Sequence, residues 1–304
     1  MTKRAVVTGA NGFLGRHVAR QLAHAGCVVV GIGHGTWRDE EWRAWGLAAW
    51  HQADVTLDAL QRHAGTPDAI VHCAGSGSVA FSLDNPIADF ERTVTTTAHV
   101  MEFARTLAPG CRVVYPSSAS VYGTVAATPI RESAATQPIS NYGANKLTAE
   151  QMVAFSAAQS GIPAAVVRLF SVYGDGLRKQ LLWDACNKLQ RGDTTFAGSG
   201  HEVRDWLHVQ DAAALLLAAI DHATPACPIV NGGSGEGTMV RDVLQHLTQH
   251  IHGAAPEFSG AQRAGDPSCF IADIAAARAL GWAPLQPLQA GVAAYVRWWK
   301  GCER

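Results

Sequence analysis

The sequence lacks the features of membrane-spanning, secreted and nucleic-acid-binding proteins. Its longest apolar run, residues 212–220, falls far short of the ~20 residues that a transmembrane helix needs. No basic segment followed by an apolar one marks a secretory signal at the N-terminus. The chain has no lysine- or arginine-rich run, and its formal net charge is −1. We therefore expect a cytoplasmic protein whose partners are neither membranes nor nucleic acids.

Cysteines are few and are not arranged for disulfides or metal ions. The seven cysteines are scattered along the chain, and no two of them stand at C-x-x-C spacing. This pattern favours reduced, mostly buried thiols. No group of histidines and cysteines has the spacing of metal ligands, so we expect no metal site. The content of 48% hydrophobic and 16% charged residues is typical of a globular protein.

Glycine, in contrast, is concentrated where a phosphate site would form. A short apolar strand at residues 5–8 runs into a G-x-x-G-x-x-G turn, and a helical pattern follows at residues 16–25. Gly9 permits the tight turn, Gly12 lets the backbone approach a pyrophosphate, and Gly15 lets the helix pack on the strand. The helix N-terminus offers N–H groups and the positive end of its dipole to the anion. The segment therefore predicts a dinucleotide-binding turn.

A second motif is Tyr-x-x-x-Lys, formed by Tyr142 and Lys146 on a predicted helix at residues 141–161. Residues four apart share a helix face, so the phenol and the ammonium can reach one ligand. A nearby ammonium favours the phenolate, and we expect it to lower the pKa of Tyr142 and suit it to acid–base work. Upstream, a predicted strand at residues 112–115 delivers Ser118 to the sheet edge where open α/β sheets bind ligands.

Predicted strands and helices alternate through the first two-thirds of the chain. Most of the strands are continuous apolar runs, as expected for strands buried on both faces. This alternation predicts an α/β fold with a doubly wound parallel sheet of the Rossmann type. The predicted strands are residues 5–8, 28–32, 48–52, 69–72, 112–115 and 164–169, and the long helices are residues 85–107 and 141–161.

The pattern changes after about residue 175, where glycine, proline and tryptophan become frequent and predicted helices dominate. We interpret this part as a smaller C-terminal substrate-binding lobe. The predicted helices of the lobe are residues 181–191, 238–252 and 288–299. The predicted division assigns residues 1–174 to the dinucleotide-binding domain, with residues 206–231 returning to it, and residues 175–205 and 232–304 to the lobe.

These motifs together resemble the extended short-chain dehydrogenase/reductase family, specifically its nucleotide-sugar branch of epimerases, dehydratases and ketoreductases. The resemblance covers nearly the whole chain. Besides the glycine turn and the Tyr-x-x-x-Lys motif, it includes Asp54 and Val55 after the third strand, where the family holds adenine. The further matching segments are residues 72–75, 168–174, 204–211, 231–233, 263–266 and 280–284.

The resemblance implies the catalytic and cofactor-binding residues. Ser118, Tyr142 and Lys146 correspond to the catalytic triad of the family. The residues implied to bind the cofactor are Gly9, Asn11, Gly12, Phe13, Leu14, Gly15, His34, Arg38, Asp54, Val55, Cys73, Ala74, Gly75, Ser117, Tyr142, Lys146 and Leu169.

The resemblance also implies how a nucleotide-diphosphate sugar would be held. Arg204 and Arg263 correspond to arginines that grip the diphosphate, a task that suits a planar bidentate cation. Asp266 corresponds to the residue that pairs with the nucleoside. The residues implied to bind the substrate are Ser118, Ser171, Gln180, Arg204, Arg263 and Asp266.

Two departures from the family pattern bear on cofactor and reaction. Members that bind NAD usually end the second strand with Asp or Glu, but Gly33 stands here, with His34 and Arg38 behind it. Without a carboxylate there is room for a 2′-phosphate, so we expect NADP(H), with NAD(H) as the alternative. Dehydratases of the family carry an acidic pair after the catalytic Ser or Thr. Ala119 and Ser120 occupy those places, which argues against dehydration.

We therefore expect an NAD(P)-dependent oxidoreductase that reduces a nucleotide-linked 4-keto-(6-deoxy)hexose, with Tyr142 as general acid. Used in both directions on one bound intermediate, the same chemistry gives a nucleotide-sugar 4-epimerase with bound NAD, which stays open as the alternative. A non-catalytic dinucleotide-binding protein is a third possibility.

The resemblance also implies a homodimer, because this family pairs two long helices from each protomer. The helices at residues 85–107 and 141–161 correspond to that pair. We expect their apolar side chains to supply a two-fold patch, formed by Val94, Ala98, Met101, Phe155 and Ala158.

Overall fold

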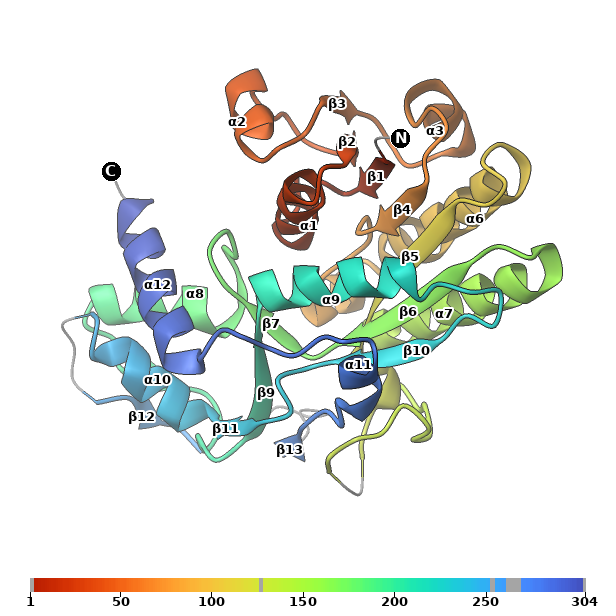
Figure 1. Ribbon diagram of the computed structural model, residues 1–304. Coiled ribbons are helices and arrows are strands. Elements are labelled where there is room, and N and C mark those ends of the chain that lie inside the picture. Colours follow the sequence, from red (N-terminus) through yellow and green to blue (C-terminus); the bar gives the residue numbers. More distant parts are fainter. Residues whose placement is uncertain (1–2, 126–127, 252–254, 261–268, 303–304) are drawn as a thin grey trace.

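Seven parallel strands form the central sheet of the protein, as the computed structural model in Figure 1 shows. The structure describes residues 3–125, 128–251, 255–260 and 269–302. The strand order is β10-β6-β5-β4-β1-β2-β3, and it reverses between β1 and β4. The strands are β1 (Arg4–Thr8), β2 (Val28–Gly33), β3 (Ala49–Gln52), β4 (Ala69–His72), β5 (Arg112–Ser118), β6 (Ala164–Leu169) and β10 (Ile229–Gly232).

This sheet confirms the predicted α/β fold of the Rossmann type. Every strand pair in it is parallel, and β1, β4 and β6 are buried along almost their whole length, which explains their continuous apolar sequences. Folds of this kind bind ligands in the crevice at the point where the strand order reverses, which here is at the carboxyl ends of β1 and β4.

Helices cover both faces of the sheet, and alternate residues of β1 separate the two cores. Val7 packs in the core that includes α1 and α9, whereas Val6 packs in the core that includes α3, α6 and α7. No helix within the described ranges is long and apolar enough to cross a membrane. The helices of this part are α1 (Phe13–His24), α2 (Asp39–Ala44), α3 (Leu57–His63), α4 (Val79–Asp84), α5 (Pro86–Phe90), α6 (Thr96–Thr106), α7 (Asn141–Ser160) and α9 (Val209–Asp221).

The predicted helix at residues 85–107 is interrupted. A π-helical turn, η1 (Glu91–Thr95), separates α5 from α6. The predicted role of Val94 and Met101 in a two-fold patch is wrong, because each of these side chains is only 3% exposed and packs inside the subunit. Phe155 on α7 is 68% exposed and so remains available to a partner.

The chain also forms a second, small sheet that the sequence pattern did not predict. β9 (Val203–His208) lies at its centre and pairs with β7, β11 and β13. The predicted helix at residues 238–252 is shorter than expected, because β11 takes up its start. The remaining elements are η2 (Ala119–Tyr122), β7 (Ser171–Tyr173), α8 (Gln180–Gln190), β8 (Thr195–Phe196), β11 (Gly237–Met239), α10 (Val240–Thr248), β12 (Glu257–Phe258), β13 (Cys269–Phe270), α11 (Ala275–Ala279) and α12 (Leu288–Gly301).

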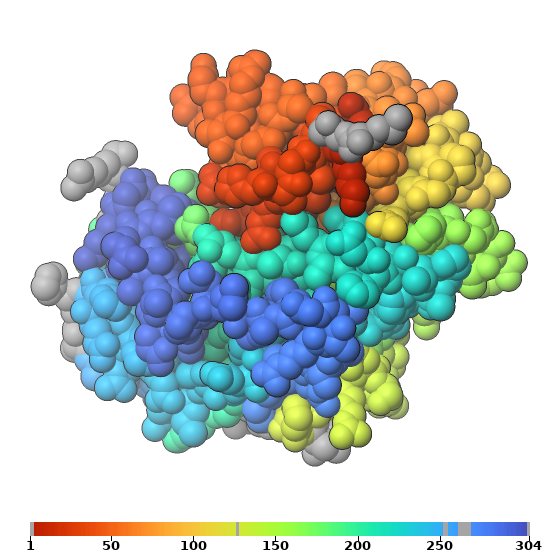
Figure 2. All heavy atoms as spheres, viewed as in Figure 1, coloured from red at the N-terminus to blue at the C-terminus, as the bar shows by residue number. Residues whose placement is uncertain are grey.

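The N-terminal and C-terminal segments lie on either side of α9 (Figure 1). In the view of Figure 2 the N-terminal segments, coloured red to orange, and the C-terminal segments, coloured blue, flank α9, which is teal. A separate apolar core joins α8, α10 and α12 within the second lobe. The segment after β6 connects the two parts, since β7 leaves the large sheet and joins β9 of the small one.

A buried ion pair fixes α7 to the sheet. The Arg168 guanidinium on β6 lies 2.8 Å from the Glu150 carboxylate on α7, and both side chains are at most 5% exposed. Arg168 also donates to the Tyr122 hydroxyl at 3.1 Å, and that hydroxyl donates to the Asn231 amide oxygen at 2.7 Å. This network ties α7, β6, η2 and β10 together.

We predict that Arg168→Leu lowers the free energy of unfolding by about 3–5 kcal/mol, because it leaves the Glu150 charge buried without its partner. Urea denaturation followed by circular dichroism measures the loss. The double variant Arg168→Leu/Glu150→Leu should lose less than the single variant, since no unpaired charge remains. A single variant as stable as the wild type would contradict the prediction.

Candidate active site

The glycine turn has the geometry of a phosphate-binding loop. Gly9 has a positive φ of 66°, and a Cβ there would lie 2.7 Å from the Ala74 backbone nitrogen. A Cβ on Gly15 would collide with the Gly9 carbonyl. Gly12 precedes α1 and has no side chain that could cap the helix. It therefore occupies none of the N–H groups of the first helical turn. The turn therefore fits a dinucleotide pyrophosphate.

A hydrogen-bonded chain joins the glycine turn to the end of β4. The Thr8 hydroxyl lies 2.7 Å from His72 Nδ1, and it accepts a hydrogen bond from the Ala74 backbone N–H at 3.2 Å. Burial and, to a smaller extent, the Lys146 charge lower the pKa of His72 to about 3, so the imidazole is neutral. Thr8, bonded to both His72 and Ala74, thus holds the loop at residues 73–75, which is predicted to line the cofactor.

The end of β2 is packed more tightly than the sequence suggests. A Cβ on Gly33 would lie 3.2 Å from Gly9 Cα and 3.3 Å from the ring of Trp50. Beyond it, His34 Nδ1 lies 3.2 Å from an Asp54 oxygen at the surface, so the structure brings these two predicted residues together.

Four further predicted cofactor residues are either paired on the surface or buried. The Arg38 guanidinium pairs with Glu41 at 2.6 Å on the surface. Val55 is buried, and so is Leu169 at the end of β6. Ser117, at the end of β5, is buried as well, and its hydroxyl has no hydrogen-bond partner within the described part of the chain. An unsatisfied buried hydroxyl beside the crevice fits a ligand-binding role.

The structure brings Ser118, Tyr142 and Lys146 together at the carboxyl ends of β4 and β5. Ser118 ends β5, and its hydroxyl lies near enough to the Tyr142 phenol for hydrogen bonding to lower the pKa of that phenol. Lys146 lies one turn further along α7 and donates to the Pro116 carbonyl oxygen at 2.9 Å. Its ammonium also lies 4.8 Å from the centre of the Tyr115 ring. This arrangement places a phenol, a hydroxyl and an ammonium at one edge of the sheet, which suits acid–base chemistry.

The expectation that Lys146 lowers the pKa of Tyr142 is wrong for this structure. Burial raises the pKa of Tyr142, a hydrogen bond with Ser118 opposes the rise, and the Asp89 charge adds to it. The ammonium has little effect because it is turned toward Pro116. Burial in turn lowers the pKa of Lys146 to about 8, so this group is still mostly charged at neutral pH.

Three side-chain contacts from α4 and α5 hold the start of α7, and sequence reasoning missed them. Ser82 accepts from the Tyr142 backbone N–H at 3.0 Å, and its carbonyl accepts from the Asn141 amide at 3.1 Å. The Asp89 carboxylate accepts from the Asn145 amide at 2.6 Å. The one signal in the sequence was an aspartate in the otherwise apolar segment of residues 86–90.

Three of the other predicted substrate-binding residues are spread over three elements. Ser171 is half-buried on β7. Gln180 starts α8 with a positive φ of 66°, a strained conformation that often marks functional sites. Arg204 lies on β9 and donates to the Val203 carbonyl oxygen at 3.0 Å. Arg263 and Asp266 lie outside the described residues.

A contact that the prediction did not use joins the two parts of the protein. Lys179, next to Gln180, donates to the carbonyl oxygen of Gly77 in the loop after β4 at 3.1 Å. Burial lowers the pKa of Lys179. In the described part of the chain, no group of three or more histidine, cysteine, aspartate or glutamate side chains is arranged to hold a metal ion.

Comparisons with known proteins agree with this geometry. The sequence model of the NAD dependent epimerase/dehydratase family matches residues 5–233. A UDP-glucose 4-epimerase of Azospirillum brasilense is 31% identical over 307 residues, which cover 92% of this chain and 87% of that protein.

Two solved structures are similar along nearly their full length. The UDP-glucose 4-epimerase of Thermotoga maritima, with UDP-glucose, has a TM-score of 0.89 at 25% identity and covers 99% of this chain and 100% of that one. The UDP-glucose-4-epimerase of Stenotrophomonas maltophila, with bound NAD and formylated UDP-arabinopyranose, has a TM-score of 0.87 at 26% identity and covers 99% of both chains.

We predict that alanine at two glycines of the turn has separable effects. Gly15→Ala should destabilise the fold by about 1–3 kcal/mol, because its methyl group meets the Gly9 carbonyl. A Cβ on Gly12 would meet only Gly9 O, at 3.0 Å, so Gly12→Ala should fold but crowd the phosphate. Its affinity for a nicotinamide dinucleotide should fall about tenfold or more, equivalent to about 1.4 kcal/mol.

Thermal melting and calorimetric titration measure the two effects. If Gly12→Ala bound the dinucleotide as tightly as the wild type, this turn would not be the phosphate site.

Proposed function

Since the chain belongs to the NAD-dependent epimerase/dehydratase family, as its resemblance to extended short-chain dehydrogenases/reductases predicted, we propose that it is a UDP-hexose 4-epimerase with bound NAD. The observation that carries the proposal is the grouping of Ser118, Tyr142 and Lys146 at the crevice of a chain 31% identical to a UDP-glucose 4-epimerase. The absence of an acid at Ala119 and Ser120 supports a reaction without dehydration.

The comparisons favour this 4-epimerase over the ketosugar reductase that the sequence favoured. The argument for the reductase depended on Gly33 leaving space for a 2′-phosphate. Packing against Gly9 and Trp50 accounts for a glycine at that position without any phosphate. Arg38 is paired with Glu41, whose carboxylate would repel a 2′-phosphate. We therefore propose that the cofactor is NAD. The expectation of NADP(H) stays a prediction without support.

The proposed mechanism assigns one task to each residue of the triad. When bound, NAD supplies the nicotinamide that takes and returns a hydride at C4 of the sugar. Tyr142 takes the proton of the C4 hydroxyl and later returns it. Ser118 hydrogen-bonds the same oxygen as its charge changes. Lys146, charged at neutral pH, would hold the nicotinamide ribose.

The proposed substrate lobe comprises residues 175–205 and 232–304, and residues 1–174 and 206–231 form the proposed dinucleotide-binding domain. Ser171, Gln180 and Arg204 are the described candidates for contacts with the UDP-sugar. We propose the UDP moiety because the similar structures hold UDP-glucose and formylated UDP-arabinopyranose. A cytoplasmic location stays a prediction.

We predict that the protein interconverts UDP-glucose and UDP-galactose without net consumption of a cofactor, and that NAD is released when it is denatured. Tyr142→Phe should lower turnover by about 10²–10⁴, as expected for a lost acid–base group. Tyr173→Phe is the matched control, because its hydroxyl donates to the Leu288 carbonyl at the start of α12 and not to a residue of the triad. Turnover of this control should stay within a few-fold of the wild type.

The turnover of both variants is measured in a discontinuous assay with coupled detection of UDP-galactose. Oxidation of NADPH by a nucleotide-linked 4-keto-6-deoxyhexose, without interconversion of the UDP-hexoses, would support the reductase instead. Full turnover of Tyr142→Phe would remove this residue from the mechanism.

We also propose that the protein is a homodimer through the face formed by α4, α5 and α7. Ile87 is 74% exposed and Phe155 is 68% exposed, and Leu83 and Phe90 on the same elements are exposed as well. Light scattering at micromolar concentration should report a dimer mass, and Ile87→Glu with Phe155→Glu should reduce it to that of the monomer. Leu285→Glu, at a residue that is 80% exposed on another segment, should not. A monomeric wild type would contradict the proposal.

A further inference from the structure

A short segment between β7 and α8 contacts the chain after both strands at which the order of the large sheet reverses. We call this segment, residues 175–179, the strap. At one end, the Asp175 carbonyl oxygen lies 2.9 Å from His17 Nε2 on α1, the helix that follows β1. At the other end, the Lys179 ammonium donates to the carbonyl oxygen of Gly77, in the loop after β4, at 3.1 Å. The strap therefore spans the point of strand reversal, where we expect the dinucleotide.

Packing fixes the α1 end of the strap. His17 is only 2% exposed, and a Cβ on Gly176 would lie 3.6 Å from the ring of Phe13. Phe13, the first residue of α1, packs in turn against the apolar core that joins α8, α10 and α12. Moving this end away from α1 would expose apolar surface on both sides, so it stays in place.

The other end of the strap is held by one hydrogen bond from an exposed side chain. Lys179 is exposed, and among the described residues the Gly77 carbonyl is the one polar partner of its ammonium. A Cβ on Gly77 would lie 3.0 Å from the ammonium nitrogen, so a glycine is what permits this close approach. Because no packed surface has to separate, this end can open and close at a small cost in free energy.

The loop that Lys179 contacts is also a neighbour of the catalytic lysine. A Cβ on Gly75, two residues before Gly77, would lie 3.8 Å from the Lys146 ammonium nitrogen. The loop thus runs between two ammonium groups, one on the catalytic helix α7 and one at the start of α8. A change at the Lys179 contact would therefore be felt close to the site of the reaction.

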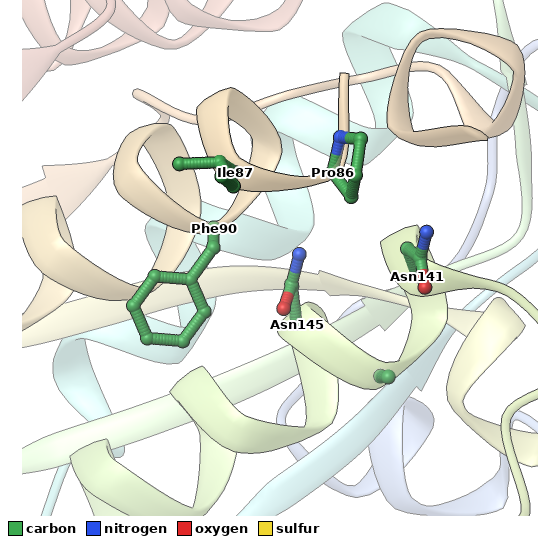
Figure 3. A pocket seen from close by; sticks show the side chains of 6 residues that line it. Pro86, Ile87, Phe90, Asn141 and Asn145 are labelled. Atoms are coloured by element: carbon green, nitrogen blue, oxygen red, sulfur yellow. The ribbon is translucent and has the colours of Figure 1, made fainter. Parts of the chain in front are cut away.

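The same loop continues into α4, which is bonded to the start of α7. Ser82 on α4 accepts from the Tyr142 backbone N–H at 3.0 Å, and its carbonyl accepts from the Asn141 amide at 3.1 Å. Figure 3 shows Asn141 at the start of α7, where it lines a cavity together with Pro86 of α5. The loop is therefore fixed to the catalytic helix, and the Lys179 contact is what joins it to α8.

The proposed reaction gives this contact a task. In its first half, the hydride at C4 of the UDP-hexose passes to NAD and the hydroxyl proton passes to Tyr142, which leaves a UDP-4-ketohexose and NADH. The second half returns the hydride and the proton to the opposite face of C4. If the protein opens between the two halves, the ketone leaves and NADH remains without a substrate to reduce.

We propose that Lys179 is a positioning residue that retains the oxidised sugar: its bond to Gly77 keeps the strap closed until the hydride has returned. This inference rests on the proposed function, because it assigns a role within that reaction. In the proposed mechanism Lys179 does not touch the reacting atoms. Its loss should therefore release the intermediate while the hydride and proton transfers themselves continue.

The variant Lys179→Met tests this role, because it keeps the length of the side chain and removes the ammonium donor. The matched control is Lys188→Met on the same helix. Lys188 also donates to a carbonyl oxygen, that of Thr195 at 2.6 Å, but within its own segment and not across to the loop after β4. Lys179→Arg, whose guanidinium can still donate to Gly77, should behave nearly as the wild type.

The first measurement follows release of the intermediate by the protein as purified, supplied with UDP-glucose. Hydroxylamine traps the free ketone as its oxime for mass spectrometry, and the NADH absorbance reports the reduced cofactor left behind. Lys179→Met should give about fivefold more oxime and NADH per UDP-galactose formed, equivalent to about 1 kcal/mol. Lys188→Met should match the wild type. An unchanged ratio in Lys179→Met would overturn the proposal, and so would a higher KM for UDP-glucose without release, which marks a substrate ligand.

The second measurement needs no reaction. Amide hydrogen exchange of the peptide that contains residues 75–80 reports opening of the loop in the protein without UDP-sugar. Exchange should be about fivefold faster in Lys179→Met than in the wild type or in Lys188→Met, because the loop has lost its contact with α8. Equal exchange in all three proteins would show that the lysine does not hold the loop.

The two proposals fail in different ways. If exchange of the loop becomes faster but no protein interconverts UDP-hexoses, the proposed function is wrong and the contact made by Lys179 stands. If UDP-hexoses are interconverted but neither exchange nor release changes in Lys179→Met, the function stands and the role of Lys179 is wrong.

Discussion

The buried ammonium of Lys146 is the constraint on which the site depends. A charge removed from water needs polar partners, or it loses its proton. Here the Pro116 carbonyl accepts from it at 2.9 Å, and the face of the Tyr115 ring lies 4.8 Å away. Both partners belong to β5, so satisfying the ammonium fixes the register of α7 against the strand that ends in Ser118. Tyr142 then meets the Ser118 hydroxyl as a consequence of that register.

The same face of α7 carries a second buried charge one turn later. Glu150 follows Lys146 by four residues and pairs with Arg168 on β6, so two neighbouring strands each hold one turn of the helix. Arg168 extends the network through Tyr122 to Asn231 on β10. The helix α7 is therefore anchored to β5 and β6 by its two buried charges and to β10 through Tyr122, and the apolar core fills the space between these anchors.

The sequence predicts the large sheet well and the contacts across it poorly. Strands such as β1 and β6 are continuous apolar runs, so they stand out without any knowledge of neighbours. Strands of two or three residues, such as β8 and β11, form only because a partner lies beside them. Asp89 meets α7 from 56 positions earlier in the chain, a separation that no local pattern reveals. Gly33 could not decide the cofactor, because the sequence does not distinguish a glycine that packs against a loop from one that leaves room for a ligand.

The proposed 4-epimerase reaction places a demand on the whole molecule that a reductase would not. The oxidised sugar must stay bound between the two hydride transfers, so the two parts of the protein must remain closed over it. The Lys179 contact with the Gly77 carbonyl joins the start of α8 to the loop after β4 on the other side of the crevice. Burial lowers the pKa of this lysine, which weakens the contact as pH rises, because a neutral amine is a poorer donor. Retention of the intermediate would then depend on the proton held by Lys179, whose contact joins the two sides of the crevice.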